Sequence, residues 1–168
     1  YDNCRWRDTI SKWNKQMNEQ LSHIDQHGQA SMVDVSAKPS MHRKAIAIGF
    51  FIAKKETLDT VMDGNLPKGE ALAVARIAGI QAAKSCGSFI PLCHPLPIEC
   101  ATVAFERVAP DRLQITATAT ITAKTGIEME ALTAVSVAAL TLWDMTKAID
   151  KDLRIDGIVL VEKTKVNI

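Results

Sequence analysis

The 168-residue sequence lacks a long apolar run that is free of charge. A helix that spans a bilayer needs about 20 consecutive apolar residues, and no uncharged stretch of this sequence approaches that length. The start of the sequence also lacks the apolar region of a secretory signal peptide. We therefore expect a soluble protein that does not act in or on a membrane.

The sequence also lacks an excess of charge of either sign, since 20 Lys and Arg residues stand against 19 Asp and Glu residues. General binders of nucleic acid or of membrane surfaces carry a clear basic excess. Neither partner is expected here, and any basic site must be local.

Cysteine is sparse and forms no CxxC motif. The four cysteines are Cys4, Cys86, Cys93 and Cys100. Six residues separate each of the last three, which fits neither a zinc knuckle nor a redox motif. A chain of this length builds a core without disulfides. We expect reduced thiols, a reducing compartment and no metal site.

No P-loop, dinucleotide fingerprint, internal repeat or low-complexity segment is present. A bound phosphate would therefore have to be held by side chains, and we expect no cofactor. The length suits one domain. We divide the chain into an amphipathic N-terminal extension, residues 1–27, and a single domain, residues 28–168. The extension is expected to pack on the domain or a partner, and its apolar stripe comprises Trp6, Ile10, Trp13, Met17 and Leu21.

The longest regular pattern covers residues 124–151, which contain an Ala-, Leu- and Val-rich run without an internal Pro. Such a run predicts one long helix in the core. Glu128 and Glu130 fall in its first turn, where carboxylates suit the helix dipole.

Charge near the end of this predicted helix needs an explanation. Asp144, Lys147 and Lys151 are spaced i, i+3 and i+7, which places them on one helical face. One interpretation is an ordinary surface pair where the helix reaches solvent. The other is a site at either end of the helix, or two sites shared with neighbouring subunits, with Lys68, Lys124 and Lys151 crowding a partly buried Lys147.

The remaining patterns predict a β-α-α-β-β-α-β order. Alternating apolar and polar residues indicate strands, and the two central strands form a hairpin. This order is typical of an α+β ferredoxin-like fold, an antiparallel sheet packed against helices. The predicted elements are a strand at 45–53, helices at 54–62 and 70–84, strands at 98–108 and 112–123, the long helix, and a strand at 155–163.

Prolines restrict the loop SFIPLCHPLP, residues 88–97, which holds His94 between Cys93 and Pro95. A single histidine is commonly structural, but a rigid loop also aims a functional side chain well. Both interpretations stay open at this point.

Five strings follow one another along the sequence: MVDVSAKP at 32–39, KGEALAVARIAGIQAAK at 68–84, IPLCHPLP at 90–97, KTGIEMEALTAVSVAALT at 124–141 and DMTKA at 144–148. Together and in this order they resemble the cyclic pyranopterin monophosphate synthase family, also described as molybdenum cofactor biosynthesis protein C. The resemblance runs from about Gly28 to Lys163. The family's glycine-rich ending is absent from the final KTKVNI.

This resemblance implies a lyase of molybdenum cofactor synthesis. Its small-molecule triphosphate substrate would be (8S)-3′,8-cyclo-7,8-dihydroguanosine 5′-triphosphate, made by a radical SAM GTP cyclase, and its products cyclic pyranopterin monophosphate and pyrophosphate. The resemblance also implies a homohexamer, a trimer of dimers with each site at the dimer interface. We expect it in the cytoplasm, or in the mitochondrial matrix if a transit peptide preceded Tyr1.

By the same matching, Asp144 and Lys147 are the implied catalytic residues. The implied substrate-binding residues are Leu92, Cys93, His94, Met129, Glu130, Lys68, Arg43, Glu128 and Lys163. This set fits the chemistry, because a triphosphate needs several cations and ring opening and closure need a carboxylate and an amine. The candidate cations are Arg43, Lys68, Lys124, Lys147, Lys151 and Lys163.

Two other classes fit the same residues. One is a non-catalytic oligomer that binds a nucleotide or pterin, in which the cations hold phosphate without chemistry. The other is a structural ferredoxin-like assembly module, which would leave Asp144 and Lys147 without a role. Retention of the whole DMTKA string favours the enzyme, because a protein that only binds would be free to lose Asp144.

Overall fold

The computed structural model describes residue 27 and residues 29–168. The chain divides into two compact units, Tyr1–Asp34 and Val35–Ile168. The predicted amphipathic extension lies almost entirely outside the described residues. Its structure and its boundary with the following domain therefore stay predictions.

The second unit contains every strand and helix that the sequence predicts there. It also contains one short helix that was not predicted, Cys86–Phe89. The sequence predicted only that the preceding helix ends there. The predicted bounds hold to within three residues, except at the start of the first strand and in the long helix. The elements are β1 (Met41–Ile52), α2 (Lys55–Met62), α3 (Ala71–Lys84), α4 (Cys86–Phe89), β2 (Cys100–Ala109), β3 (Arg112–Ala123), α5 (Glu128–Thr146) and β4 (Arg154–Val166).

The four strands form one antiparallel sheet in the order β2-β3-β1-β4. Strands β1 and β3 lie in the middle of the sheet. They pair without interruption from Met41 opposite Ala123 to Ile52 opposite Arg112. The predicted hairpin of β2 and β3 forms one side of this sheet, and β4 returns beside β1. This topology confirms the predicted α+β, ferredoxin-like fold.

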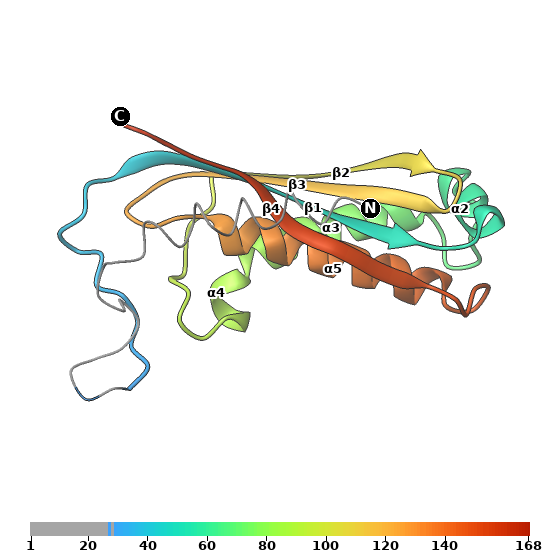
Figure 1. Ribbon diagram of the computed structural model, residues 1–168, viewed down its shortest axis with the longest axis horizontal. Helices are drawn as coiled ribbons and strands as arrows, with labels where there is room; N and C mark the ends of the chain where they lie inside the picture. Colours follow the sequence, from blue (N-terminus) through green and yellow to red (C-terminus); the bar gives the residue numbers. More distant parts are fainter. Residues whose placement is uncertain (1–26, 28) are drawn as a thin grey trace, which may run out of the picture. The chain divides into compact units, whose positions relative to one another are not determined.

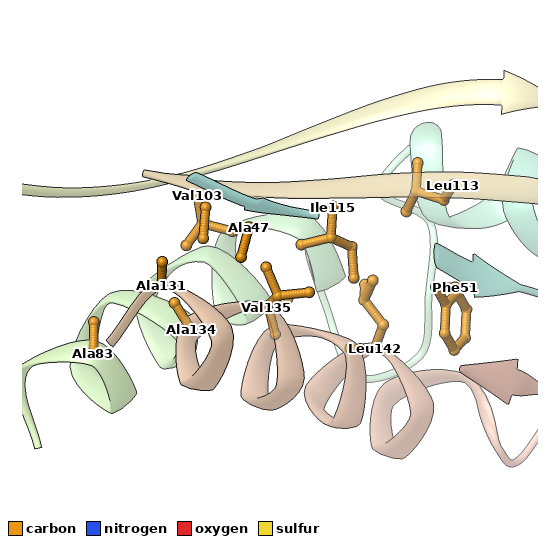
Figure 2. Close-up of a cluster of buried hydrophobic side chains, with 14 of the residues drawn as sticks. Ala47, Phe51, Ala83, Val103, Leu113, Ile115, Ala131, Ala134, Val135 and Leu142 are labelled. Atoms are coloured by element: carbon orange, nitrogen blue, oxygen red, sulfur yellow. The ribbon is translucent and has the colours of Figure 1, made fainter. Parts of the chain in front are cut away.

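Helices α3 and α5 cover one face of the sheet (Figure 1). Alternate residues of β3 are buried against them, as its sequence pattern predicts. Ile115 from β3 meets Val135 and Leu142 from α5 in this layer (Figure 2), and all three are fully buried. Because each such side chain contributes roughly 1.5–3 kcal/mol when buried, this layer fixes the position of α5 and of the side chains at its two ends.

Gly49 allows β1 to lie close to α5. A Cβ atom at this position would meet Val135 Cγ1 at 2.7 Å and Ile158 Cγ1 at 3.0 Å. The pairing of β1 with β4 shifts register at the same place, between Ile48 and Phe50. A side chain here would force the strand away from the helix.

The long helix is shorter than predicted, running over Glu128–Thr146 instead of 124–151. Lys147 is its C-cap, and the chain then turns as the amides of Ile149 and Asp150 donate to the Thr146 carbonyl at 2.9 and 3.1 Å. Lys151 therefore does not share a helical face with Asp144 and Lys147, and that prediction is wrong. Among the described residues, no helix has the length and apolar character needed to cross a membrane.

Candidate active site

A cluster of four charged residues, here called the helix-end cluster, gathers where α5 ends: Lys68, Asp144, Lys147 and Lys151. One oxygen of Asp144 lies 2.6 Å from Lys147 Nζ, and the other lies 3.0 Å from Lys68 Nζ. Lys68 also donates to the Asp144 carbonyl at 2.9 Å, and Lys151 donates to the Lys147 carbonyl at 2.6 Å. The cluster thus places one carboxylate between two ammonium groups.

The hydrogen bond from Lys147, followed by that from Lys68, lowers the pKa of Asp144 to about 2. A lowered carboxyl pKa favours the folded state above the unfolded pKa, and this effect is lost as the pH falls through about 2. Asp144 is therefore ionised throughout the physiological range. It can hold both lysines in place or accept a proton when a substrate displaces one of them.

A pocket of about 380 Å³ opens beside this cluster. Three lysines give it a positive wall, and Trp143 and Leu153 give it an apolar one. Such a lining suits an anionic ligand with a flat apolar part. The lining residues are Lys68, Trp143, Lys147, Ala148, Asp150, Lys151 and Leu153. Within the part of the chain that the structure describes, no group of three His, Cys, Asp or Glu side chains is arranged to hold a metal ion.

A second set of residues, the helix-start cluster, surrounds the first turn of α5: Cys93, Glu128, Met129, Glu130 and Lys163. Lys163, on β4, forms an ion pair with Glu128 Oε1. Met129 is 38% exposed, whereas Glu130 is only 3% exposed. The cluster combines a paired carboxylate, a buried carboxylate and an exposed apolar side chain.

Burial is the main cause that raises the pKa of Glu130, and the charge of Glu128 acts in the same direction. Burial also raises the pKa of Cys93, followed by the charge of Glu130. The pKa of Cys86 rises to about 11 through burial, and its Sγ lies 3.5 Å from Thr133 Oγ1. Both thiols are therefore protonated near neutral pH and are poor nucleophiles.

Among the described residues, the three cysteines Cys86, Cys93 and Cys100 are free. Their reduced state stays a prediction. Cys4 lies outside the described residues. The state of the three thiols agrees with a chain that relies on its apolar core rather than on disulfides.

The PLCHPL loop rests against α4, which precedes it. The amide of Cys93 donates to the Ile90 carbonyl at 3.0 Å and forms a tight turn. A Cβ atom on Gly87 would lie 3.1–3.2 Å from Pro95 and the His94 carbonyl, so a side chain here would require α4 and the loop to separate by a few tenths of an ångström. Figure 1 shows α4 near the start of α5, the end that carries the helix-start cluster.

Arg43 and Lys124 brace the connection between β3 and α5. Arg43 donates to the carbonyls of Ala123 and Lys124 at 3.0 and 3.2 Å, and Lys124 Nζ donates to the Ser36 carbonyl at 2.6 Å. Because Lys124 precedes α5 and Lys147 follows it, Lys124 does not crowd Lys147 within one subunit. The Lys147 side chain is 56% exposed in the single chain, so it is partly covered but reaches solvent.

The two clusters lie far apart within one chain. Glu130 and Asp144 are 14 residues apart on α5, which corresponds to about 21 Å at 1.5 Å per residue. The structure thus brings Lys68 to Asp144 and Lys147, and separately brings Lys163 to Glu128. It does not bring the two predicted groups of site residues together in one subunit.

Sequence reasoning did not find Trp143 or Asp150 as residues of the pocket. Trp143 directly precedes the DMTKA string. The apolar pattern of this helix predicted a buried side chain there and did not indicate that Trp143 is 36% exposed. Two of the three donors to Asp150, the Lys54 amide and Thr57 Oγ1, lie more than 90 residues away in the sequence, so no local pattern indicated its place in the pocket.

Replacing Glu130 with Gln is expected to raise the melting temperature at pH 7. A raised carboxyl pKa favours folding below the unfolded pKa, and this effect is lost as the pH rises toward the folded pKa. At pH 7 the buried charge therefore destabilises the fold, and Gln removes it. Thermal unfolding at pH 7 and pH 4 should show a gain that shrinks at the lower pH.

Glu128→Gln is the matched control for this comparison. Glu128 is paired with Lys163, so its neutralisation should give no gain at pH 7. If Glu130→Gln lowers the melting temperature equally at both pH values, burial of the charge is not what governs stability at this position.

A family model described as the MoaC family matches residues 32–165. This match covers both clusters, the pocket and all of the sheet except Val166, the last residue of β4. It begins just before the boundary between the two compact units.

Individual relatives agree with the family match. The cyclic pyranopterin monophosphate synthase of Novosphingobium aromaticivorans is 56% identical over 143 residues, covering 85% of this chain and 90% of the relative. Cyclic pyranopterin monophosphate synthase 1 of Mycobacterium bovis is 54% identical over 86% of this chain and 85% of its own length. The Desulfitobacterium hafniense synthase is 52% identical, with 86% and 89% covered. The family model and these relatives each match most of the length of this chain. The chain therefore belongs to the MoaC family.

Proposed function

We propose that this chain is a cyclic pyranopterin monophosphate synthase of molybdenum cofactor biosynthesis. Its substrate would be (8S)-3′,8-cyclo-7,8-dihydroguanosine 5′-triphosphate, and its products cyclic pyranopterin monophosphate and pyrophosphate. The relatives bear this name. The observation that carries the proposal is the ionised Asp144 between Lys147 and Lys68, beside a pocket lined by three lysines.

The reaction sets two requirements that this geometry meets. A substrate oxygen attacks the α-phosphorus, and the bond from that phosphorus to the oxygen bridging to the β-phosphorus breaks as pyrophosphate leaves. Lysines placed around the leaving group stabilise its growing charge. Proton transfers that open and close the rings need a carboxylate and an amine near one substrate, and Asp144 and Lys147 supply them. The overall reaction is that of a phosphorus-oxygen lyase.

The active site would be completed by a second subunit. The distance between the clusters, about 21 Å along α5, exceeds what one pterin ring system with its phosphates can bridge while lying in both. The helix-end cluster of one subunit would therefore face the helix-start cluster of its partner, in dimers that form a hexamer. The partner would contribute the pterin- and ribose-binding side, with Leu92, Cys93, His94, Met129, Glu130, Glu128, Lys163 and Arg43 around it.

The proposed substrate also defines the chain's place among its partners. A radical SAM GTP cyclase would supply it, and no cofactor or metal takes part in our proposal. The expected compartment is reducing, either the cytoplasm or the mitochondrial matrix.

Incubation with the cyclised dihydro-GTP tests this proposal. Mass spectrometry should detect the cyclic monophosphate product, and a coupled assay should detect an equal amount of pyrophosphate. Asp144→Ala is the control, and it should bind the substrate without releasing pyrophosphate. If the unaltered protein binds the substrate but releases no pyrophosphate, the chain is a binding protein and not an enzyme.

A further inference from the structure

Asp150 is a charged side chain with no exposed surface, and it lies in the wall of the pocket. Its Oδ2 accepts hydrogen bonds from the amide of Lys54 at 2.8 Å and from Thr57 Oγ1 at 3.0 Å. Its Oδ1 accepts one from the amide of Asp152 at 2.9 Å. These donors lower the pKa of Asp150 against the opposing effect of burial. A buried charge satisfied this completely fixes the segments that supply its donors.

The first of these segments is the start of α2. Lys54 is the N-cap residue of this helix, and its own side chain caps none of the free amides. Asp150 supplies the anion that a helix N-terminus favours, although it comes from a turn 96 residues later. Lys54 Nζ adds an ion pair with Asp152 at 2.9 Å.

The second segment is the turn over residues 147–152, which follows α5 and carries two of the pocket's lysines. Lys147 begins this turn, and Lys151 Nζ donates back to the Lys147 carbonyl at 2.6 Å. Both lysines have long, exposed side chains, so the place of their ammonium groups depends on how firmly the backbone beneath them is held. Asp150 provides the buried anchor of that backbone.

We propose that Asp150 is a positioning residue for the active site. By fastening the turn over residues 147–152 to the start of α2, it would set the placement of Lys147 and Lys151 relative to Asp144 and Lys68. This inference rests on the proposed function for its effect on turnover, but its effect on the turn itself does not depend on that function.

Asp150→Asn tests the proposal with little change of shape. One of its two oxygens becomes an NH₂ group, which faces amide or hydroxyl donors and cannot accept from them. The turn then loses part of its anchor. We expect kcat to fall by about 10- to 100-fold, as when a residue that supports catalytic groups is altered, while KM changes by less than about threefold, because the substrate contacts remain.

Asp59→Asn is the matched control on the same helix. Asp59 accepts from Arg107 Nη1 at 2.6 Å, which fastens α2 to β2, and from Lys55 Nζ of its own helix at 2.7 Å, and it does not line the pocket. The control should lower the melting temperature while kcat stays within about twofold of the unaltered protein. Thr57→Val is a milder variant that removes one of the three donors, and its kcat should fall between the two.

Hydrogen exchange of the amides in residues 146–153 gives a readout that needs no substrate. Exchange there should be faster in Asp150→Asn and unchanged in Asp59→Asn. The proposal is overturned if residues 146–153 exchange at the same rate in Asp150→Asn and Asp59→Asn. It is also overturned if both variants lose kcat equally, or if Asp150→Asn raises KM and leaves kcat unchanged. If the unaltered protein shows no turnover, the proposed function fails, and the exchange result still decides whether Asp150 fixes the turn.

Discussion

Lys147→Arg is expected to lose activity nearly as badly as Lys147→Ala, by on the order of 10²-fold or more in kcat. Arg keeps the positive charge next to Asp144, but its guanidinium does not release a proton in the working pH range. The change therefore separates a fixed charge from an amine that gives and takes protons. We expect the second role, because the proposed ring rearrangement needs an amine partner for the Asp144 carboxylate.

The geometry makes this comparison a fair one. Lys147 Nζ lies 2.6 Å from Asp144 Oδ1, and its side chain is half exposed, so an Arg side chain can reach the same carboxylate without a clash in the core. Lys151→Arg is the matched control in the same turn, and it should keep most of its activity. If Lys147→Arg also keeps most of its activity, Lys147 acts as an electrostatic clamp, and acid–base work falls to Asp144 or His94.

Local sequence patterns predicted most strands and helices of the second unit, because the buried face of each element is written in its own residues. The alternation in β3 gives a fully buried face that includes Leu113 and Ile115, and the apolar run of α5 lies against it. The end of α5 was predicted five residues too late, because its turn is held by Asp150 reaching Lys54 and Thr57. No pattern within 124–151 reports such a distant contact.

The candidate site was only partly readable from the sequence. Asp144 and Lys147 are three residues apart, so helical spacing alone indicated that they meet. Lys68 is 76 residues from Asp144, and only the family resemblance pointed to it. The sequence left two interpretations open, a site at either end of the helix or sites shared between subunits. The distance of about 21 Å between the two clusters along α5 favours the shared site.

Two inactive variants are expected to restore activity when they are combined in one dimer. Asp144→Ala damages the helix-end cluster, and Lys163→Ala damages the helix-start cluster by removing the partner of Glu128. If each site takes one cluster from each subunit, a mixed dimer contains one site with both changes and one site with neither. The intact site should turn over at its normal rate.

The size of the recovery follows from random pairing. Equal amounts of the two variants give half mixed dimers, each with one intact site of two, so activity should reach about one quarter of that of the unaltered protein. Co-expression with two different affinity tags and purification through both selects the mixed dimers and should raise the value to about one half. The control is Asp144→Ala combined with Lys147→Ala, which damage the same cluster and leave no intact site in any pairing. If the first combination stays as inactive as this control, each site is built within one subunit, and the two clusters cannot serve the same substrate.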